Sequence, residues 1–446
     1  MTKAIFIYIT SAILIFIILG LQYYDSYVEY LDVHLINIAY LLAFAVVIFI
    51  FLKYKNVRVR QLLIVCLVFN LAFGCAYVIS INAHTDLLFQ YVPSDAPFYD
   101  SAGREVSQGN FIENIQAVMA RTNYGIDDMG MVIYVGLIYK ITDSPLLVKL
   151  INLFINLLST YLIFNIGRPF MSKKFALLGA LCFSISSFNI WFLIVGLKEP
   201  VMILIILSYF YSLLKFTTSR KSGYLWLMLF ATLSLLFFRT ALVIFLLIST
   251  VAGVVFRNGI SFKKAVIILF LIAFTGVVIY FYKETFQIYF RQENASVYSG
   301  DTETSSNINF TIVFSAGVFG PFPTVVPKTD KRFADISVYA PSLIFKVFIS
   351  LFFLFGIYFV FKEKHYHLIP IIAFCFVEIM ALTLIDNTFK LRYVYPHFPF
   401  VYIIGFYGLY YVFEKRVNET RLLREIATGF QLGSLAFILL WNILRL

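Results

Sequence analysis

Apolar segments long enough to form transmembrane helices follow one another along almost the whole chain, with polar connections between them. Most are about 16–24 residues long, which as α-helix matches a hydrocarbon layer of roughly 30 Å. The pattern predicts an all-α polytopic membrane protein, a single integral membrane domain over residues 1–446 with 13 transmembrane helices. The segments cover residues 4–22, 35–52, 61–81, 145–166, 175–196, 200–216, 224–238, 240–256, 265–282, 342–361, 368–385, 395–413 and 429–444.

One apolar stretch, residues 224–256, is too long for a single helix across most bilayers, and only Arg239 interrupts it. The connections on both sides of it, residues 215–221 and 257–264, are basic. Two short helices that meet in a turn near Arg239 would place both basic connections on the same side of the membrane.

Composition supports the membrane assignment and excludes a soluble enzyme. Hydrophobic residues make up 61% of the chain and charged residues 13%, whereas soluble domains average about 45–50% and about 25%. The net charge of +11 does not indicate nucleic acid as a partner, because in a membrane protein the placement of basic residues carries the information. Four cysteines lie in apolar segments without metal-binding spacing, and we expect them to be buried hydrophobic residues: Cys66, Cys75, Cys182 and Cys375.

The distribution of charge predicts the topology. If Lys3 is cytoplasmic, alternation places six connections inside, and with Lys3 they hold 20 of the 35 basic residues but 4 of the 24 acidic ones. This bias is what the positive-inside rule describes, so we expect a cytoplasmic N-terminus and a first helix that is retained, since no cleavage site follows it. The inner connections are residues 53–60, 168–174, 215–221, 257–264, 362–364 and 414–425.

Only two connections are large, residues 82–144 and residues 283–341, and alternation places both on the outer face. We therefore expect any functional site at that face, formed by these two extracytoplasmic loops and the outer helix ends. No Gly-rich phosphate-binding loop for ATP occurs in the chain.

The first of these loops contains carboxylates that we expect near the membrane surface. Asp95, Asp127 and Asp128 stand out because the loop continues into residues 131–141, an apolar stretch too short to span. Such a stretch is typical of a helix that lies in the interface. The alternative for each of these carboxylates is a solvated loop position.

Cations are expected at the same depth. Lys198 and Glu199 occupy a connection of about four residues, where the alternative is an interfacial ion pair or a snorkelling side chain. Arg239 requires a carboxylate or an anionic ligand. Lys390 and Arg392 follow Asp386 in another short outer turn. We expect these two cations and Arg239 to lie together around an anion. A base beside a cationic site for phosphate suits glycosyl transfer from a polyprenyl-phosphate sugar.

Several short motifs resemble membrane glycosyltransferases of the GT-C superfamily. The run Asp95-Ala96-Pro97-Phe98-Tyr99-Asp100-Ser101-Ala102, with Gly109 after it, is similar to the first-loop pattern D-x-x-x-Y-x-x-A…G of enzymes that use dolichyl- or undecaprenyl-phosphate sugars. Lys198-Glu199 resembles the start of a later helix in that superfamily. Arg392-Tyr393 with Pro396 and Pro399 resembles its R-Y-x-x-P-x-x-P element, and Gly320-Pro321-Phe322-Pro323 is similar to a P-F-P element of bacterial relatives.

The resemblance implies a GT-C-like fold in the bacterial cytoplasmic membrane and an inverting transfer at its periplasmic face, in O-antigen, capsule or other surface-polysaccharide assembly. The donor would be an undecaprenyl-phosphate-linked sugar, the acceptor a glycan or lipid-linked glycan, sometimes with a divalent cation such as Mg or Mn. The position of Asp95 in the motif favours it as the base. Asp100 is the alternative, because Ala96 stands where these enzymes often have a second acidic residue. Donor binding is expected at Tyr99, Lys198, Glu199, Arg239, Lys390, Arg392 and Tyr393.

Two other functions remain open. A repeat-unit polymerase for O-antigen or capsule would depend on outer arginines, here Arg239, Arg291 and Arg332. A lipid-linked oligosaccharide flippase or transporter would instead use ionisable residues deep in the membrane, and three lie well inside apolar segments: Lys149, Lys346 and Glu378.

Overall fold

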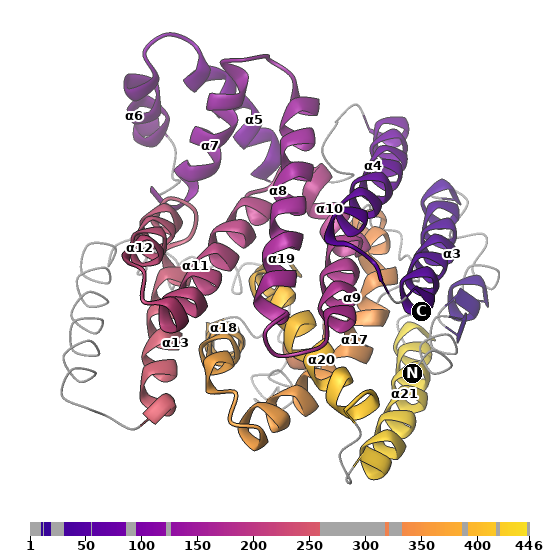
Figure 1. Ribbon diagram of the computed structural model, residues 1–446. Coiled ribbons are helices and arrows are strands. Elements are labelled where there is room, and N and C mark those ends of the chain that lie inside the picture. Colours follow the sequence, from indigo (N-terminus) through magenta and orange to yellow (C-terminus); the bar gives the residue numbers. More distant parts are fainter. Residues whose placement is uncertain are drawn as a thin grey trace.

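The protein is a multi-pass helical membrane protein. The computed structural model describes residues 10–11, 13–18, 31–54, 56–85, 95–121, 126–258, 317–320, 332–385, 391–415 and 420–443. Within these ranges all regular structure is helical. The principal helices (Figure 1) are α3 (Leu31–Lys53), α4 (Val59–His84), α5 (Asp95–Ser107), α6 (Phe111–Arg121), α7 (Ile126–Tyr139), α8 (Pro145–Gly167), α9 (Lys173–Ser184), α10 (Ser187–Val195), α11 (Glu199–Ser219), α12 (Ser222–Leu236), α13 (Thr240–Asn258), α17 (Arg332–Lys362), α18 (Ile369–Ile385), α19 (Leu391–Val394), α20 (Phe398–Phe413) and α21 (Thr420–Ile443), with 3-10 turns η2 (Tyr366–Leu368) and η3 (Tyr395–His397).

Six helices of the described chain are long and apolar enough to cross a membrane, or seven if the bent pair α9–α10 counts as one span. The described residues therefore account for six or seven of the 13 expected spans. Three further helices are apolar but shorter, namely Ser222–Leu236, Thr240–Phe256 and Glu425–Leu440. The 15 residues of α12 extend about 22 Å at 1.5 Å per residue, which is less than the roughly 30 Å hydrocarbon layer. The expected segments 4–22 and 265–282 fall largely or wholly outside the described residues.

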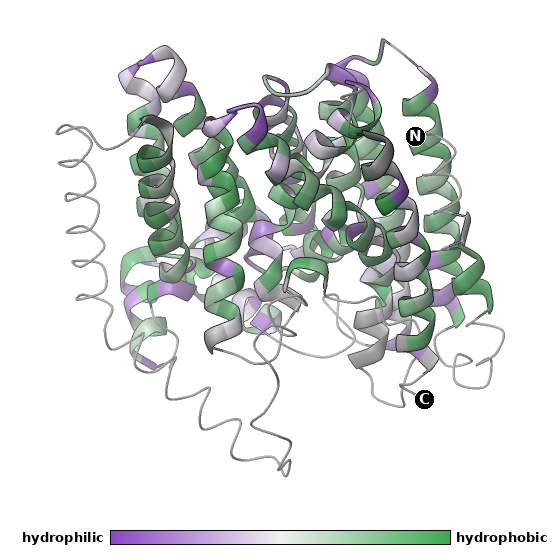
Figure 2. Ribbon diagram, turned by 90° about the horizontal axis from the view of Figure 1, so that it is seen from below, coloured by the Kyte–Doolittle hydropathy of each residue, from purple (hydrophilic) through white to green (hydrophobic). Residues whose placement is uncertain are grey.

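Apolar side chains cover the outside of the bundle as well as its interior. On α8 the exposed large residues recur one turn apart, at Leu146, Leu150, Phe154 and Leu158, and thus form a stripe along one helix face. Figure 2 shows that hydrophobic residues occupy most of the length of the helices. A soluble protein rarely exposes so large an apolar surface, which is the surface that lipid tails require. Cys75 also lies exposed on α4, so the prediction of burial is wrong for this cysteine, whereas the other three are buried.

The predicted inner connections gather at one end of the bundle. Lys174 Nζ donates to the carbonyl of Leu52 at 2.8 Å, which joins the start of α9 to the end of α3. Three further pairs lie in or next to four of the predicted inner segments: Ser172 with Glu414 at 3.2 Å, Lys415 with Glu363 at 3.2 Å, and Phe256 with Phe361 at 6.4 Å between ring centroids.

At the opposite end, the predicted first loop, residues 82–144, contains α5, α6 and α7, which form a helical cap (Figure 1). Helices α5 and α7 cross closely at two glycines, because a Cβ on Gly103 would lie 2.4 Å from Val135 and one on Gly136 would lie 3.0 Å from Val106. Residues 131–139 of the predicted apolar stretch 131–141 belong to α7 and pack against α5. Most of the second predicted loop, residues 283–341, lies outside the described residues, although α17 already begins at Arg332.

The predicted break near Arg239 is confirmed, and a second break divides the predicted helix 175–196. Helix α12 ends at Leu236 and α13 begins at Thr240. Helices α9 and α10 meet at an angle of 47°. The freed backbone groups of this second break are satisfied by side chains: Tyr40 Oη donates to the carbonyl of Ile185 and accepts from the amide of Ser187, both at 2.9 Å.

We predict that the two ends of the bundle lie on opposite sides of the membrane. Single cysteines at Asn56 and Thr142, both exposed, would be tested in a Cys75→Ser background with a membrane-impermeant maleimide. Because the two positions terminate opposite ends of spanning helices, vesicles of opposite orientation should each expose one of them. Labelling of both cysteines from the same side would contradict the arrangement.

Candidate functional site

The cap meets the membrane helices at a buried ion pair between Lys198 and Asp128. Lys198 is 2% exposed and Asp128 17%. Tyr99 of α5 donates to the same carboxylate oxygen, Asp128 Oδ1, at 3.0 Å, and Lys198 Nζ also lies 3.4 Å from the carbonyl of Asp127. We call Tyr99, Asp127, Asp128 and Lys198 the cap cluster. Three segments far apart in the chain are joined there.

Backbone geometry places Arg239 beside this cluster. The amide of Gly130 donates to the carbonyl of Phe237 at 2.7 Å, which ties the first turns of α7 to the turn between α12 and α13. A Cβ on Gly130 would lie 2.7 Å from the same carbonyl oxygen, so only glycine permits this approach. Arg239, 9% exposed, places its guanidinium 4.7 Å from the ring centroid of Tyr393. This is a cation–π distance.

Burial and neighbouring charges shift the pKa values of two groups in the cap cluster, Asp127 and Lys198. Burial, and then the neighbouring Asp128 carboxylate, raise the pKa of Asp127, while Lys198 and Arg239 act in the opposite direction. Burial lowers the pKa of Lys198, whereas the Asp128 carboxylate opposes that shift. A carboxyl group with a raised pKa next to two cations is a typical environment for acid–base chemistry and for binding an anion.

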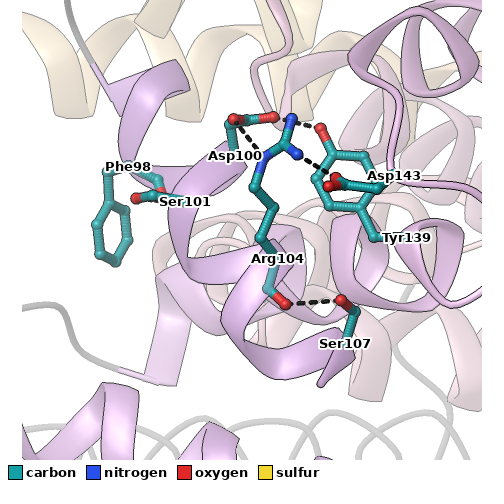
Figure 3. Close-up of polar contacts among 7 residues, drawn as sticks. All are labelled: Phe98, Asp100, Ser101, Arg104, Ser107, Tyr139 and Asp143. Carbon is teal, nitrogen blue, oxygen red and sulfur yellow. Dashed lines mark hydrogen bonds and ion pairs between the residues drawn. The ribbon is translucent and has the colours of Figure 1, made fainter.

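Asp100 belongs to a separate group of polar residues on α5 (Figure 3). Its Oδ2 accepts from Arg104 Nε at 3.1 Å and its Oδ1 accepts from Tyr139, while Arg104 also binds Asp143. The Asp100 contact raises the pKa of Arg104. Asp100, Tyr99 and Lys149 line a small cleft with room for about one water molecule.

The structure brings together four residues that the sequence assigned to one site: Tyr99, Lys198, Arg239 and Tyr393. Glu199, the first residue of α11, is fully buried, and its charge acts on Lys198. Neither Lys198 nor Glu199 therefore snorkels towards lipid headgroups. Lys390 and the side chain of Arg392 lie outside the described residues, so the expected approach of these two cations to Arg239 stays a prediction.

Asp95 is the first residue of α5. It precedes Tyr99 by four residues, which places the two on the same helix face. Because Tyr99 reaches Asp128, this is the face that meets the cap cluster. Asp100 binds instead to Arg104 and Tyr139, so the two candidate bases have different surroundings.

The site assignment from sequence omitted Asp128, which connects the cluster. The sequence places Asp127 and Asp128 near the membrane surface but assigns them no role. The pairing of Asp128 with Lys198, 70 residues further along the chain, leaves no local signal in the sequence.

The described residues offer little to a divalent cation. They contain no group of three or more His, Cys, Asp or Glu side chains that could hold a metal ion. Asp127 and Asp128 are the nearest approximation, but Lys198 and Tyr99 already occupy one oxygen of Asp128. Magnesium needs carboxylates that are open to its octahedral shell, so we assign it no step.

We predict that the buried ion pair is a major contributor to stability. Lys198→Met leaves Asp128 without its cation and should lower the free energy of unfolding by about 3 kcal/mol. Thermal unfolding in detergent measures this. The double variant Lys198→Met/Asp128→Leu should recover much of the loss, because no uncompensated charge remains. The matched control is Arg121→Met, in an exposed pair with Glu105, which should cost less than about 1 kcal/mol.

Asp127 should make stability depend on pH. Because its pKa is raised above the ordinary value of 3.8, the folded state binds this proton more tightly than the unfolded state. Stability from this group is therefore greatest below pH 3.8 and falls as the pH rises through the raised folded-state pKa. The difference in unfolding temperature between the wild type and Asp127→Asn, followed across the pH range, should show this decline. A difference that does not vary with pH would contradict the shift.

Comparison with known proteins adds no assignment: no protein-family model, curated protein or solved structure matches the chain. A functional conclusion therefore depends on the chemistry of the cap cluster and of the helices beneath it.

Proposed function

We propose that the chain is an integral membrane glycosyltransferase that transfers a sugar from an undecaprenyl-phosphate-linked donor. The observation that carries the proposal is the meeting of carboxylates, a buried lysine and Arg239 at one end of the bundle. The short GT-C-like motifs agree with it, because Tyr99, Lys198 and Tyr393 of three separate motifs lie in or next to this site. Surface-polysaccharide assembly would be the process served.

The proposed chemistry assigns a role to each kind of group. An acceptor hydroxyl oxygen attacks the anomeric carbon, and a carboxylate takes the hydroxyl proton. The bond between the anomeric carbon and the phosphate oxygen breaks, and the polyprenyl phosphate leaves with the electron pair. Arg239 and Lys198 stabilise the charge that grows on the departing phosphate. Lys390 and Arg392 are proposed to extend this cationic surface.

We further propose a GT-C-like arrangement of 13 spans in a bacterial cytoplasmic membrane, with the N-terminus cytoplasmic and the cap cluster periplasmic. The support is the concentration of basic residues in the connections at the opposite end. Lipid-linked donors would then reach the site from the membrane and a glycan acceptor from the periplasm.

Asp95 is the proposed base. It lies one turn before Tyr99 on the α5 face that meets Asp128 and is only partly buried. Asp100 is less suited because Arg104 and Tyr139 engage both of its oxygens. Asp127 is the competing candidate, since its pKa is raised and Arg239 is close.

We predict that Asp95→Asn lowers sugar transfer by about 10²–10⁴-fold, because the amide keeps the shape but cannot accept the proton. Transfer would be measured in proteoliposomes as release of undecaprenyl phosphate from a panel of undecaprenyl-phosphate sugars. Asp100→Asn should have a milder effect, and the exposed Glu113→Gln on α6 serves as the matched control.

Other outcomes of the same assay reassign the base or the function. Loss of transfer only in Asp127→Asn would move the base to Asp127. Near-normal transfer by Asp95→Asn, Asp100→Asn and Asp127→Asn would contradict a carboxylate mechanism and favour the repeat-unit polymerase that depends on arginines.

A flippase or transporter for lipid-linked sugars is the second candidate. Two observations favour it: the break between α9 and α10, and the buried ionisable residues Lys149, Lys346 and Glu378, which are features of transport pathways. Movement of a fluorescent undecaprenyl-linked sugar between leaflets, without release of undecaprenyl phosphate, would identify this function.

A further inference from the structure

A carboxyl group and an imidazole face each other deep inside the helix bundle. Glu378 Oε2 of α18 lies 3.3 Å from His397 Nδ1 of η3, and the two side chains are 2% and 0% exposed. Glu378 precedes Ile385, the last residue of α18, by seven residues, which places it about 10 Å below that helix end. Neither side chain belongs to the cap cluster.

Ordinary packing does not account for these two side chains. Neither Glu378 Oε2 nor either ring nitrogen of His397 makes a hydrogen bond within the described chain. Their 3.3 Å approach is a close contact without hydrogen-bond geometry. Burying such groups costs several kcal/mol relative to an apolar pair, and ionisable residues at this depth in membrane proteins generally have a function.

The surrounding charges favour a pair that can release its proton. Arg239 lies close enough for its charge to act on Glu378, and Lys346 does the same for His397. Cys375 is the other ionisable group within electrostatic reach of Glu378. Helix α13, which packs along α18, has no ionisable side chain between Thr240 and Phe256. The charge of Arg239 therefore offsets a negative charge on Glu378, while Lys346 lies on the imidazole side of the pair and disfavours a positive charge on His397.

We propose that Glu378 and His397 form an intramembrane proton-binding site. The pair holds one proton, either as a carboxylic acid beside a neutral imidazole or as a carboxylate beside an imidazolium. Transfer between these forms breaks one O–H bond and makes one N–H bond. Release of the proton to water leaves a carboxylate, whose charge Arg239 offsets, beside a neutral ring, which the neighbouring Lys346 favours. The site does not depend on sugar transfer.

Arg239 connects this site to the cap cluster. Its charge acts on both Asp127 and Glu378, and its guanidinium lies over Tyr393, which precedes His397 by four residues. Water that reaches Arg239 is the source and sink of the proton. Exchange is therefore expected from the end of the bundle that carries the cap.

We predict that infrared spectroscopy of the full-length protein in lipid detects a carboxylic acid C=O band that titrates with pH. The band should be absent in Glu378→Gln, whose amide mimics the protonated acid and preserves packing. It should persist in Glu363→Gln, a control at a surface ion pair with Lys415. In His397→Asn its titration midpoint should shift, since the second partner of the proton is lost.

A measurement on the wild-type protein keeps the test valid if a variant fails to fold. Nitrogen NMR of the labelled histidines should show one ring whose chemical shifts change over the same pH range as the infrared band, because that ring shares the proton of Glu378. A spectrum unaltered by Glu378→Gln, a band that does not change between about pH 4 and pH 9, or a midpoint unmoved in His397→Asn would each overturn the proposal.

Discussion

The requirement that buried backbone groups be satisfied within the protein determines this architecture, and the break between α9 and α10 shows how. Inside a bilayer an interrupted helix is tolerated only where other groups replace its lost hydrogen bonds. Here Tyr40 bridges the break, Ser186 caps the start of α10 through the amide of Asn189, and Ser342 accepts from the amide of Phe188 at 2.9 Å. Residues from α3, α10 and α17 therefore have to meet at this point.

The break in turn fixes the position of the functional end of the bundle. Helix α10 has only nine residues and ends at Val195. Gly196 follows with a φ of +81° and redirects the chain two residues before Lys198. Lys149 donates to the carbonyl of Ile194 and so satisfies one of the last acceptors of α10. Lys198 then precedes the first residue of α11 and pairs with Asp128. A lysine that sequence alone would place at the lipid interface is thereby buried in an ion pair.

Hydropathy and charge could predict the helices, the break at Arg239 and the grouping of the inner connections, since each depends on local composition. The inner grouping follows from alternation, because each helix reverses the direction of the chain. The break at Ile185 could not be predicted in this way. Its backbone partners come from Tyr40 and Ser342, which are distant in sequence, and no glycine or proline marks it.

The candidate functional site could likewise be predicted only in part from the sequence. Hydropathy placed Lys198 and Arg239 at one depth, and the resemblance to GT-C motifs added Tyr99 and Tyr393 to the same site. The sequence could not indicate that Asp128 is the contact point, because that depends on the approach of Gly130 to the carbonyl of Phe237. Nor could it pair Glu378 with His397, which meet only through the packing of α18 on η3.

The segment from α19 to η3 joins the three polar regions of the protein. Alternate residues along it contact different regions: Tyr393 lies against Arg239, Tyr395 donates to Asn189 beside the helix break, and His397 faces Glu378. In a regular α-helix residues two apart do not share a face, and the 3-10 turn η3 changes their directions further. A movement of this segment would therefore change its contacts with more than one of these regions. Movement of Tyr393 with Arg239 would change the surroundings of His397, and the charge of Arg239 acts on both Asp127 and Glu378, so this segment and Arg239 connect the cap cluster with the buried pair.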